Sequence, residues 1–575
     1  MFWISGLLLM VHGVHPKTMT SYSFRADPPP RARPFQNGRF LFIRGTVVFM
    51  FAMLALRLVY VQAVLRSDLQ QKADRQIPRS ANVRSMRNNI LDRHGAVLAE
   101  TVQVTSCYVD PSEMKDKKKV AKFLADVLDV NFNTVLKKIN STKGSFVWIK
   151  RNVPAHAVEQ IKSQKISGVG FKKEWRRNYP LTPIASHLIG LVGIDGHGLS
   201  GIEMMYEASL SGQIPDKLKK NPPVLGDIQL SIDATIQKVV EKELEWGAEK
   251  TGAKKGMAIV QDPQTGDILA IASWPPISLD PDDPPDPLEL RIPPLVDAFE
   301  PGSTFKIVIA AASIEEKTVR PHELFSGENG KWKVKDITIH DHEARPVMTF
   351  DDIFVYSSNI GTGKLAEKLG AEKLFQYIRL FGFGIFPGSG LPAEAKGVLR
   401  PLNKWSGVSK YVISFGQELS VTGLQVVGAY SAIANGGTLM EPRIVKAIKN
   451  TQGKSEWNSF PTPVRRVVSL ETAHRVTDIL SKAVEEGTGQ NAAVQWRKDF
   501  KVAGKTGTAQ KFDSANRRYH KDQTLISFCG YFPANAPTFS MIIIYDEPEG
   551  RRWGGMDAAP VFRRIAEQIA AAPNT

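Results

Sequence analysis

The segment from Ser303 to Glu316, STFKIVIAAASIEE, constrains the fold more than any other part of the chain. After its first turn it is apolar on nearly every side, and a helix with this pattern is stable when other elements bury it all round. We therefore expect a helix at the centre of a domain. Glu300-Pro301-Gly302 precedes it, and the preference of serine for the N-cap places the start of the helix at Ser303.

The C-terminal half predicts the sheet against which that helix packs. Two β-rich runs flank the turn at residues 263–266 in GMAIVQDPQTGDILAIAS and predict a hairpin. The runs FKVAG, TLISFCGYF and FSMIIIY follow one another, joined by polar stretches as in an antiparallel sheet, and APVFRRIAEQIAAA predicts a closing helix. The expected fold class is α/β (α+β), an antiparallel sheet flanked by helices.

The length of 575 residues and shifts of composition divide the chain into four parts. Residues 1–38 form a tail, which is Pro- and Arg-rich over residues 21–38, and residues 39–65 form an apolar segment. Residues 66–225 mix short strands and helices with many basic residues. Residues 226–575 are more apolar and contain the predicted sheet. A linker is expected at residues 215–223, so that 226–575 is expected to fold alone.

The apolar segment predicts a transmembrane helix, with a buried soluble helix as the alternative. Its uninterrupted core, Gly45 to Leu56, has 12 residues, fewer than the roughly 20 that span a bilayer. Spanning therefore needs the flanks, with Arg44 and Arg57 reaching to the interfaces. The arginines that precede the segment favour a cytoplasmic N-terminus.

The net charge of +16 limits the kinds of binding partner, and the presence of only two cysteines limits the disulfide content. The positive charge is compatible with binding to nucleic acid, to an anionic membrane surface or to an acidic cell-wall polymer. The absence of a nucleic-acid-binding motif speaks against nucleic acid. Cys107 and Cys529 lie far apart, which excludes a disulfide framework and predicts two free thiols that pack as small core residues.

Ser303 and Lys306 are the first candidates for catalysis. A spacing of three residues on a helix puts both side chains on one face. A serine hydroxyl becomes a useful nucleophile when a base lies beside it, and burial lowers the pKa of a lysine so that it can be that base. Taken alone, S-x-x-K is common, and a helix cap with a surface lysine is the alternative.

Two further motifs support a catalytic role for Ser303 and Lys306. Ser357-Ser358-Asn359 follows 54 residues after Ser303, and Lys505-Thr506-Gly507-Thr508 ends the strand FKVAG. The order S-x-x-K, S-x-N, K-T-G is the motif set of penicillin-binding proteins and class A β-lactamases. The stretch from His340 to Glu343 is a weaker candidate for a metal site, and a polar hairpin is favoured there because no third ligand follows. Neither a metal nor a cofactor is expected.

With these motifs the chain resembles the class B penicillin-binding proteins over most of its length. Residues 87–95, RNNILDRHG, are similar to the family's R-G-x-I-x-D-R-x-G, with Asn88 in place of glycine. Residues 177–180, RNYP, and 198–203, GLSGIE, match two more family patterns, and SFGQELSVTGLQVVGAYSAIANGG from Ser414 is similar to a long family segment. The resemblance implies a penicillin-recognising transpeptidase domain behind a pedestal domain of the dimerisation type.

The resemblance also implies a role for each matched residue. Ser303 would be acylated by the penultimate D-Ala of a stem peptide, and Lys306 would take its proton. Ser357 would relay that proton to the leaving amine, and Asn359 would hold the substrate amide. Lys505 would supply positive charge and orient Ser357.

The remaining motif would bind the end of the substrate. Thr506, Gly507 and Thr508 would hold the terminal carboxylate of the peptide or of a β-lactam. The backbone N–H groups of Ser303 and Thr508 would form the oxyanion hole.

The implied function is cross-linking of peptidoglycan on the outer side of the bacterial inner membrane, in septal wall synthesis. A membrane-embedded glycan polymerase is the implied partner. The alternatives are an elongation-type transpeptidase, a β-lactamase or penicillin sensor, and a non-enzymatic scaffold. The last would have lost Ser303, Lys306 or Lys505, and all three are present.

Overall fold

The structure is a computed structural model that describes residues 37–60 and 86–571, apart from gaps at 142–145, 219–220, 281, 392, 451, 498–499, 514–515 and 517. The chain divides into two compact units, residues 1–83 and 84–575.

In the first unit the apolar segment forms the helix α1 (Asn37–Val59), with large apolar side chains such as Phe42, Phe51 and Leu56 exposed. Residues 61–65 of the predicted span lie outside the described residues. Among the helices of the described ranges, none is long and apolar enough to cross a membrane. The predicted transmembrane helix is therefore not supported.

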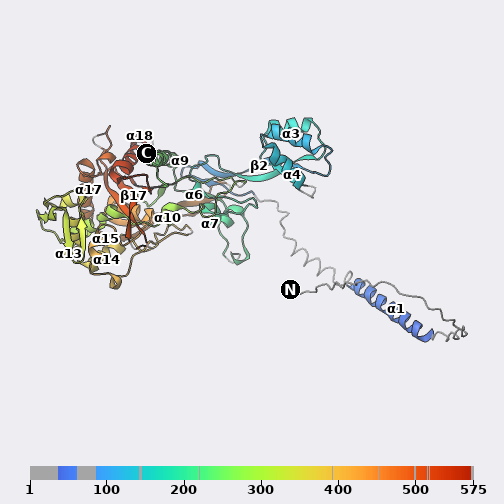
Figure 1. Cartoon of the computed structure of the whole chain (residues 1–575), viewed down its shortest axis with the longest axis horizontal. Coiled ribbons are helices and arrows are strands. Elements are labelled where there is room, and N and C mark those ends of the chain that lie inside the picture. The colour runs from blue at the N-terminus through green and yellow to red at the C-terminus, as the bar shows by residue number, and fades with distance from the viewer. Residues whose placement is uncertain are drawn as a thin grey trace, which may run out of the picture. The chain divides into compact units, whose positions relative to one another are not determined.

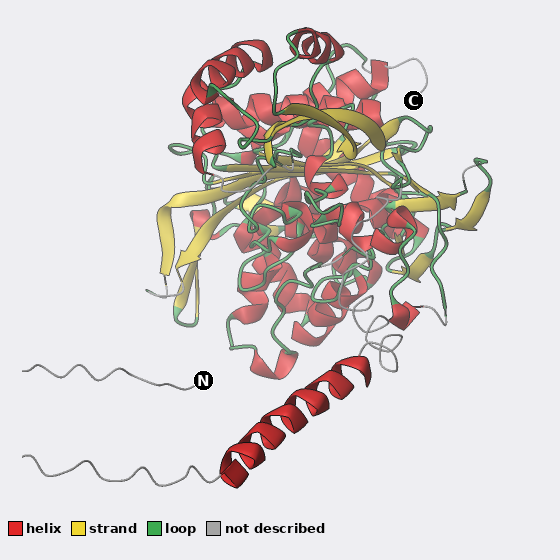
Figure 2. Cartoon of the chain, turned by 90° about the vertical axis from the view of Figure 1, so that its right-hand side faces the viewer, coloured by secondary structure: helices red, strands yellow, loops and turns green. Residues whose placement is uncertain are grey.

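The catalytic half of the second unit is built on a five-stranded antiparallel sheet in the order β16-β17-β18-β6-β7. Figure 2 shows its strands running between two groups of helices. The predicted antiparallel sheet flanked by helices is thus confirmed. The strands are β16 (Ala503–Asp513), β17 (Arg518–Phe532), β18 (Phe539–Asp546), β6 (Lys255–Gln261) and β7 (Ile268–Trp274).

Each face of this sheet has its own hydrophobic core. One core joins the sheet to α9 (Ala234–Thr251) and α18 (Gly554–Ala571). The other joins it to α11 (Lys306–Glu315) and α16 (Gly423–Ala434), beside α17 (Leu470–Glu485). Eight of the ten residues of α11 are buried, as its apolar sequence predicts. Both cysteines are free and buried.

A second sheet connects the two halves of this unit. Its order is β14-β13-β5-β1-β2-β3, and β4 also pairs with β2. The strand β5 (Asp227–Leu230) lies between β1 (Ile90–Leu91) and β13 (Val445–Lys449), so strands from both sides of residue 226 share one sheet. The expected linker therefore does not separate two independent cores.

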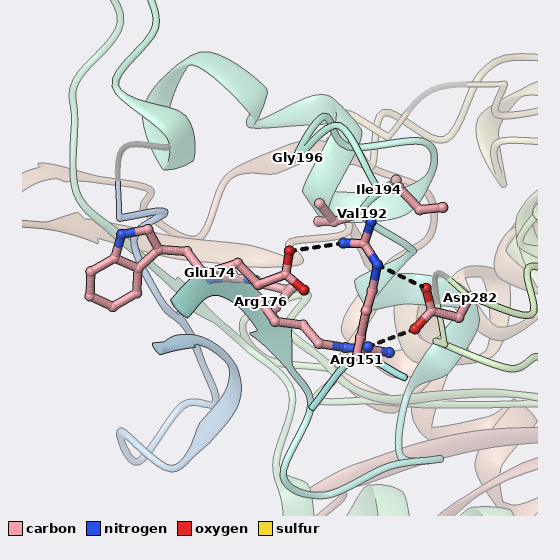
Figure 3. Close-up of a pocket in the computed structure, with 10 residues that line it drawn as sticks. Arg151, Glu174, Arg176, Val192, Ile194, Gly196 and Asp282 are labelled. Atoms are coloured by element: carbon pink, nitrogen blue, oxygen red, sulfur yellow. Dashed lines mark hydrogen bonds and ion pairs between the residues drawn. The ribbon is translucent and has the colours of Figure 1, made fainter. Parts of the chain in front are cut away.

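The long strands β2 (Val97–Val109) and β4 (Val169–Asn178) lead away from the catalytic half to a small subdomain with its own core (Figure 1). It contains α3 (Lys117–Leu128), α4 (Phe132–Ser141), β3 (Val147–Lys150) and α5 (Ala155–Ser163). Where β4 passes the proline-rich loop, Arg176 pairs with Asp280 and Asp282. Asp282 also approaches Arg151, and these side chains line a small pocket of about 50 Å³ (Figure 3).

Three sequence patterns without catalytic residues meet in one buried ion cluster. Glu203 accepts a 2.6 Å hydrogen bond from Nε of Arg87 and a 2.7 Å bond from Nε of Arg177, and its side chain has no exposed surface. Each of these residues comes from a different pattern, at 87–95, 177–180 and 198–203. The patterns therefore hold β1, β4 and α7 (Gly201–Met205) together.

Shorter elements complete the unit. The remaining helices are α6 (Ser186–Ile189), α8 (Glu207–Ser211), α10 (Pro293–Val296), α12 (Phe350–Val355), α13 (Asn359–Leu369), α14 (Ala371–Leu380) and α15 (Ser409–Ser414). The remaining strands are β8 (Phe325–Ser326), β9 (Lys331–Val334), β10 (Ile337–His340), β11 (Val347–Met348), β12 (Thr438–Met440), β14 (Ser455–Asn458) and β15 (Pro463–Arg466).

Candidate active site

Ser303 lies in a tight turn ahead of α11 and not at a helix N-cap as the sequence predicted. Residues Gly302–Phe305 form a 3₁₀ turn, and α11 follows from Lys306. Gly302 has φ +54°, and a Cβ at this position would lie 2.8 Å from the carbonyl oxygen of Thr508. The turn therefore needs glycine, and it lies directly against β16.

Lys306 is fully buried and lies among acceptors. Its Nζ is 2.6 Å from the carbonyl oxygen of Ser357, 3.3 Å from Ser357 Oγ and 2.8 Å from Oδ1 of Asn359. Burial lowers the pKa of Lys306 well below its usual value, and the charge of Lys505 lowers it further, against a smaller opposing effect of Asp341. A neutral amine within reach of a serine hydroxyl is the arrangement that a general base requires.

Ser357 connects the base to the nucleophile. It ends the turn after α12 with φ +61°, a conformation that is unfavourable for a residue with a side chain. Its Oγ donates a 3.0 Å hydrogen bond to Oγ of Ser303. Strained backbone thus places one hydroxyl between Lys306 and Ser303.

Asp341 holds this turn in place, a role that the sequence did not reveal. Its Oδ1 accepts from the backbone N–H groups of Asn359, at 2.6 Å, and Ile360, at 3.0 Å, and its Oδ2 accepts from Oγ of Ser358 at 2.6 Å. A carboxylate at the N-terminus of α13 is favourable for these orphan donors and for the helix dipole. Asp341 comes from the stretch 340–343 that was weighed as a metal site and a polar hairpin.

Lys505 enters the site from β16 and is 1% exposed. Its Nζ donates to Oγ1 of Thr488 and Oγ1 of Thr506, both at 3.3 Å, and these two hydroxyls are 3.0 Å apart. Burial lowers the pKa of Lys505 to about 7. The lysine that is hydrogen-bonded to Ser357 is Lys306, so the described residues do not show Lys505 orienting Ser357.

The end of the site beyond Lys505 is closed by the start of α18. The backbone N–H of Gly554 donates to Oγ1 of Thr508 at 3.3 Å. A Cβ on Gly507 would lie 2.3 Å from Oγ of Ser527, so the middle position of the motif needs glycine. Two hydroxyls, an ammonium and a helix N-terminus at one end of a cleft suit a carboxylate.

The other end of the site opens into a groove of about 1270 Å³. It starts where β16 continues as Ala509-Gln510-Lys511 and includes Glu300, three residues before Ser303. Because β16 is the edge strand of its sheet, its outer backbone groups can pair with an extended peptide.

The structure brings the three predicted motifs together at one place. The side chains of Ser303, Lys306, Ser357 and Asn359 form one connected group, and Lys505 and Thr506 form a second. Sequence reasoning missed Asp341 and Thr488. The only available signal for Thr488 was its position between two glycines, which marks a constrained loop and no particular chemistry.

Comparisons with known proteins identify the family of both halves of this unit. Residues 256–567 match the family model of the penicillin-binding protein transpeptidase domain, and residues 82–217 match that of the penicillin-binding protein dimerisation domain. The probable peptidoglycan D,D-transpeptidase PenA of Neisseria meningitidis is 32% identical over 552 residues, which cover 92% of both chains.

Two further relatives have similar coverage. Stage V sporulation protein D of Bacillus subtilis is 33% identical over 553 residues, 92% of this chain and 84% of that protein. Peptidoglycan D,D-transpeptidase FtsI of Escherichia coli is 29% identical over 561 residues, 92% of this chain and 91% of FtsI.

Solved structures show the same fold. Penicillin-binding protein 3 of Mycobacterium tuberculosis, complexed with aztreonam, has a TM-score of 0.66 at 29% identity, covering 84% of this chain and 95% of that one. Its complex with ampicillin also has a TM-score of 0.66, at 28% identity, covering 85% of this chain and 98% of that one.

Proposed function

The chain belongs to the class B penicillin-binding proteins and is a peptidoglycan D,D-transpeptidase of the serine type, and on that premise we propose that Ser303 is its nucleophile. The observation that carries this assignment is the hydrogen-bonded chain from Lys306 through Ser357 to Ser303. It supplies a buried base, a relay and a nucleophile in the order that acyl transfer needs.

In the first half of the reaction, Ser303 Oγ attacks the carbonyl carbon of the penultimate D-Ala. Its proton passes through the hydroxyl of Ser357 to the neutral amine of Lys306. The bond to the terminal D-Ala then breaks, and the leaving nitrogen takes a proton from the same chain. The backbone N–H groups of Ser303 and Thr508 stabilise the oxyanion.

In the second half, an amine of a neighbouring stem peptide attacks the ester on Ser303. Its proton returns to Ser303 Oγ through the same groups, and the cross-link is formed. Lys505, Thr506, Gly507 and Thr508 hold the carboxylate of the donor. Asn359 aligns the donor amide, although in the free enzyme its Oδ1 accepts from Lys306.

A β-lactam would acylate Ser303 in the same way, and the solved complexes of a relative with aztreonam and ampicillin support this. Fluorescent penicillin should therefore label the wild-type chain covalently. Ser303→Ala should abolish the labelling while leaving the fold intact, as judged by circular dichroism. Labelling of Ser303→Ala at another serine would sink the assignment.

A role in division is supported by the similarity to FtsI over nearly the whole chain. The expected site of action is the septum, and an elongation-type enzyme is the alternative. A fluorescent fusion that complements a depleted strain should gather at midcell before constriction. A fusion that follows the side wall instead would favour the elongation-type role.

The proposed reaction implies on which side of the membrane the catalytic part lies. Peptidoglycan is cross-linked outside the plasma membrane, so the catalytic part is expected there, with residues 39–65 as the anchor and residues 1–38 in the cytoplasm. The exposed apolar side chains of α1 support an apolar partner for this segment, either lipid or a membrane-embedded glycan polymerase. A reporter active only outside the cytoplasm should work after Thr575 and be silent after Arg33.

A further inference from the structure

The groove beyond Thr508 has charges that pair with one another, with one exception. Within the described part of its wall, Lys255 pairs with Asp297 at 3.3 Å, Arg400 with Glu418, and Lys511 with Asp546 at 3.0 Å. Glu300 has no cationic partner among the described residues. The negative charge of Glu418 also acts on Glu300 and contributes to raising its pKa.

Hydrogen bonds hold one carboxylate oxygen of Glu300, and the other oxygen has no hydrogen-bond partner among the described residues. Its Oε1 accepts a 3.0 Å hydrogen bond from the backbone N–H of Glu418 and a 3.2 Å bond from the hydroxyl of Tyr519. Its Oε2 is buried and has no hydrogen-bond partner in the described structure. A buried acceptor without a donor is unfavourable. Glu300 as a whole is partly exposed and lines the groove, so a rotation of its carboxyl group toward a donor on a ligand would satisfy this oxygen.

Burial also raises the pKa of Glu300 to about 7. The carboxyl group is therefore poised between its neutral and charged forms. A cation at Oε2 would favour the charged form and bind to it through a charge-assisted hydrogen bond.

The path of the substrate leads past this group. With the terminal carboxylate at Thr506 and Thr508, the peptide cannot continue toward α18, because Gly554 and Gly555 pack against that end. It must run along the edge of β16 toward Gln510, at about 3.4 Å per residue. The residue that precedes the two D-Ala residues then lies about two positions past the carboxylate, in the groove that Glu300 lines.

The cross-linking reaction implies that the donor stem peptide has a side-chain amine. The acyl group is transferred to an amine of a neighbouring stem peptide, and donor and acceptor strands are made of the same units. A donor peptide therefore has a side-chain amine of its own, which is charged at neutral pH.

We propose that Glu300 is a specificity-determining residue that recognises the side-chain ammonium of the donor stem peptide, on the residue before D-Ala-D-Ala. The substrate class is a stem peptide whose diamino acid has a free amine. This inference rests on the proposed placement of the terminal carboxylate. It explains why a carboxyl without a cationic partner lies beside the nucleophile turn.

The test compares two small peptides as competitors of fluorescent-penicillin labelling. One is Nα-acetyl-L-lysyl-D-alanyl-D-alanine, which has a free side-chain ammonium, and the other is its Nε-acetylated form, which has none. For each, the concentration that halves the labelling rate is measured with the full chain, with Glu300→Gln and with Glu471→Gln. Glu471 is an exposed carboxylate on α17 that forms no ion pair with the described residues, so its replacement controls for the loss of one negative charge.

The wild-type chain and Glu471→Gln should bind the free-ammonium peptide about tenfold more tightly than the acetylated one. In Glu300→Gln the two peptides should compete equally. The ratio of the two half-inhibiting concentrations does not change if the substitution lowers the labelling rate in general. Equal competition in the wild-type chain, no competition by either peptide, or an unchanged ratio in Glu300→Gln would each overturn the proposal. Absence of penicillin labelling in the wild-type chain would instead contradict the proposed nucleophile.

Discussion

Oγ of Ser357 lies 3.0 Å from Oγ of Ser303 and 3.3 Å from Nζ of Lys306. In the free enzyme Lys306 donates a hydrogen bond to Ser357, and Ser357 donates one to Ser303. Activation of Ser303 reverses that direction, which requires Lys306 to have a free lone pair. Its other two contacts, with the Ser357 carbonyl and Asn359, use only acceptor atoms and leave the third direction for Ser357.

Replacing the base should therefore slow acylation without removing the nucleophile. Lys306→Met keeps an apolar stem of similar length in a fully buried position. We expect acylation by penicillin to be slower by about 10²-fold or more, the effect typical of losing a general base. Stopped-flow or quenched labelling measures it, with thermal unfolding as the check that the variant folds. A rate close to that of the wild-type chain would place the base elsewhere.

The two buried lysines predict a bell-shaped pH profile for acylation. Lys306 must be neutral, so the rate should rise with pH as Lys306 loses its proton, at a pH well below its usual range. Lys505 must be charged to attract a carboxylate, so the rate should fall as pH rises through its pKa of about 7. The second-order rate constant of penicillin acylation, measured from about pH 5 to about pH 9, reports these pKa values for the free enzyme. A rate that still rises above pH 8 would show that Lys505 is not needed as a cation.

Much of the site was accessible from the sequence because its motifs are short and lie at the ends of recognisable elements. The helix of residues 303–316 and the strand before Lys505 could be predicted from their apolar patterns, and these two elements position Ser303, Lys306 and Thr506. The start of the helix was misplaced at Ser303, because the 3₁₀ turn depends on Gly302 meeting β16, which is a tertiary contact.

Other features depend on contacts between distant parts of the chain, and no local pattern encodes them. Asp341 looked like part of a polar hairpin, because its partners at Ser358, Asn359 and Ile360 come from a separate helix start. The boundary at residue 226 was drawn from composition, whereas β5 completes a sheet begun by β1.

This shared sheet changes what is expected of a shortened chain. A fragment of residues 226–575 contains every catalytic motif, but it lacks β1 and the carboxylate of Asp92, which accepts from the backbone N–H of Ala234 at the start of α9. It would also expose Ile228 and Leu230, which are fully buried in the whole chain.

We therefore expect residues 226–575 to unfold at a lower temperature than residues 84–575 and to give a smaller fraction labelled by penicillin. Differential scanning calorimetry and labelling stoichiometry measure the two effects. The longer fragment serves as the control, since it retains the whole compact unit. Equal melting temperatures would show that the catalytic half does not depend on β1.

The buried ion cluster makes the last prediction. Glu203 has no exposed side-chain surface and balances Arg87 and Arg177, which are 5% and 3% exposed. Glu203→Gln keeps the shape but leaves two buried guanidinium groups without their shared charge, and breaking such a cluster costs about 3–5 kcal/mol. The matched control is Glu207→Gln: Glu207 also lies 2.8 Å from Arg87, but its side chain is 29% exposed, so its loss should cost about 1 kcal/mol or less. Urea unfolding of residues 84–575 measures both free-energy differences.

The same cluster is expected to affect activity only through stability. Arg177 and Glu203 join β4 and α7 to the start of β1, which pairs with β5. We therefore expect Glu203→Gln to reduce the penicillin-labelled fraction in proportion to the unfolded fraction, with no change in the acylation rate of the folded molecules. A slower rate in molecules that remain folded would mean that this cluster acts on the active site and not on stability alone.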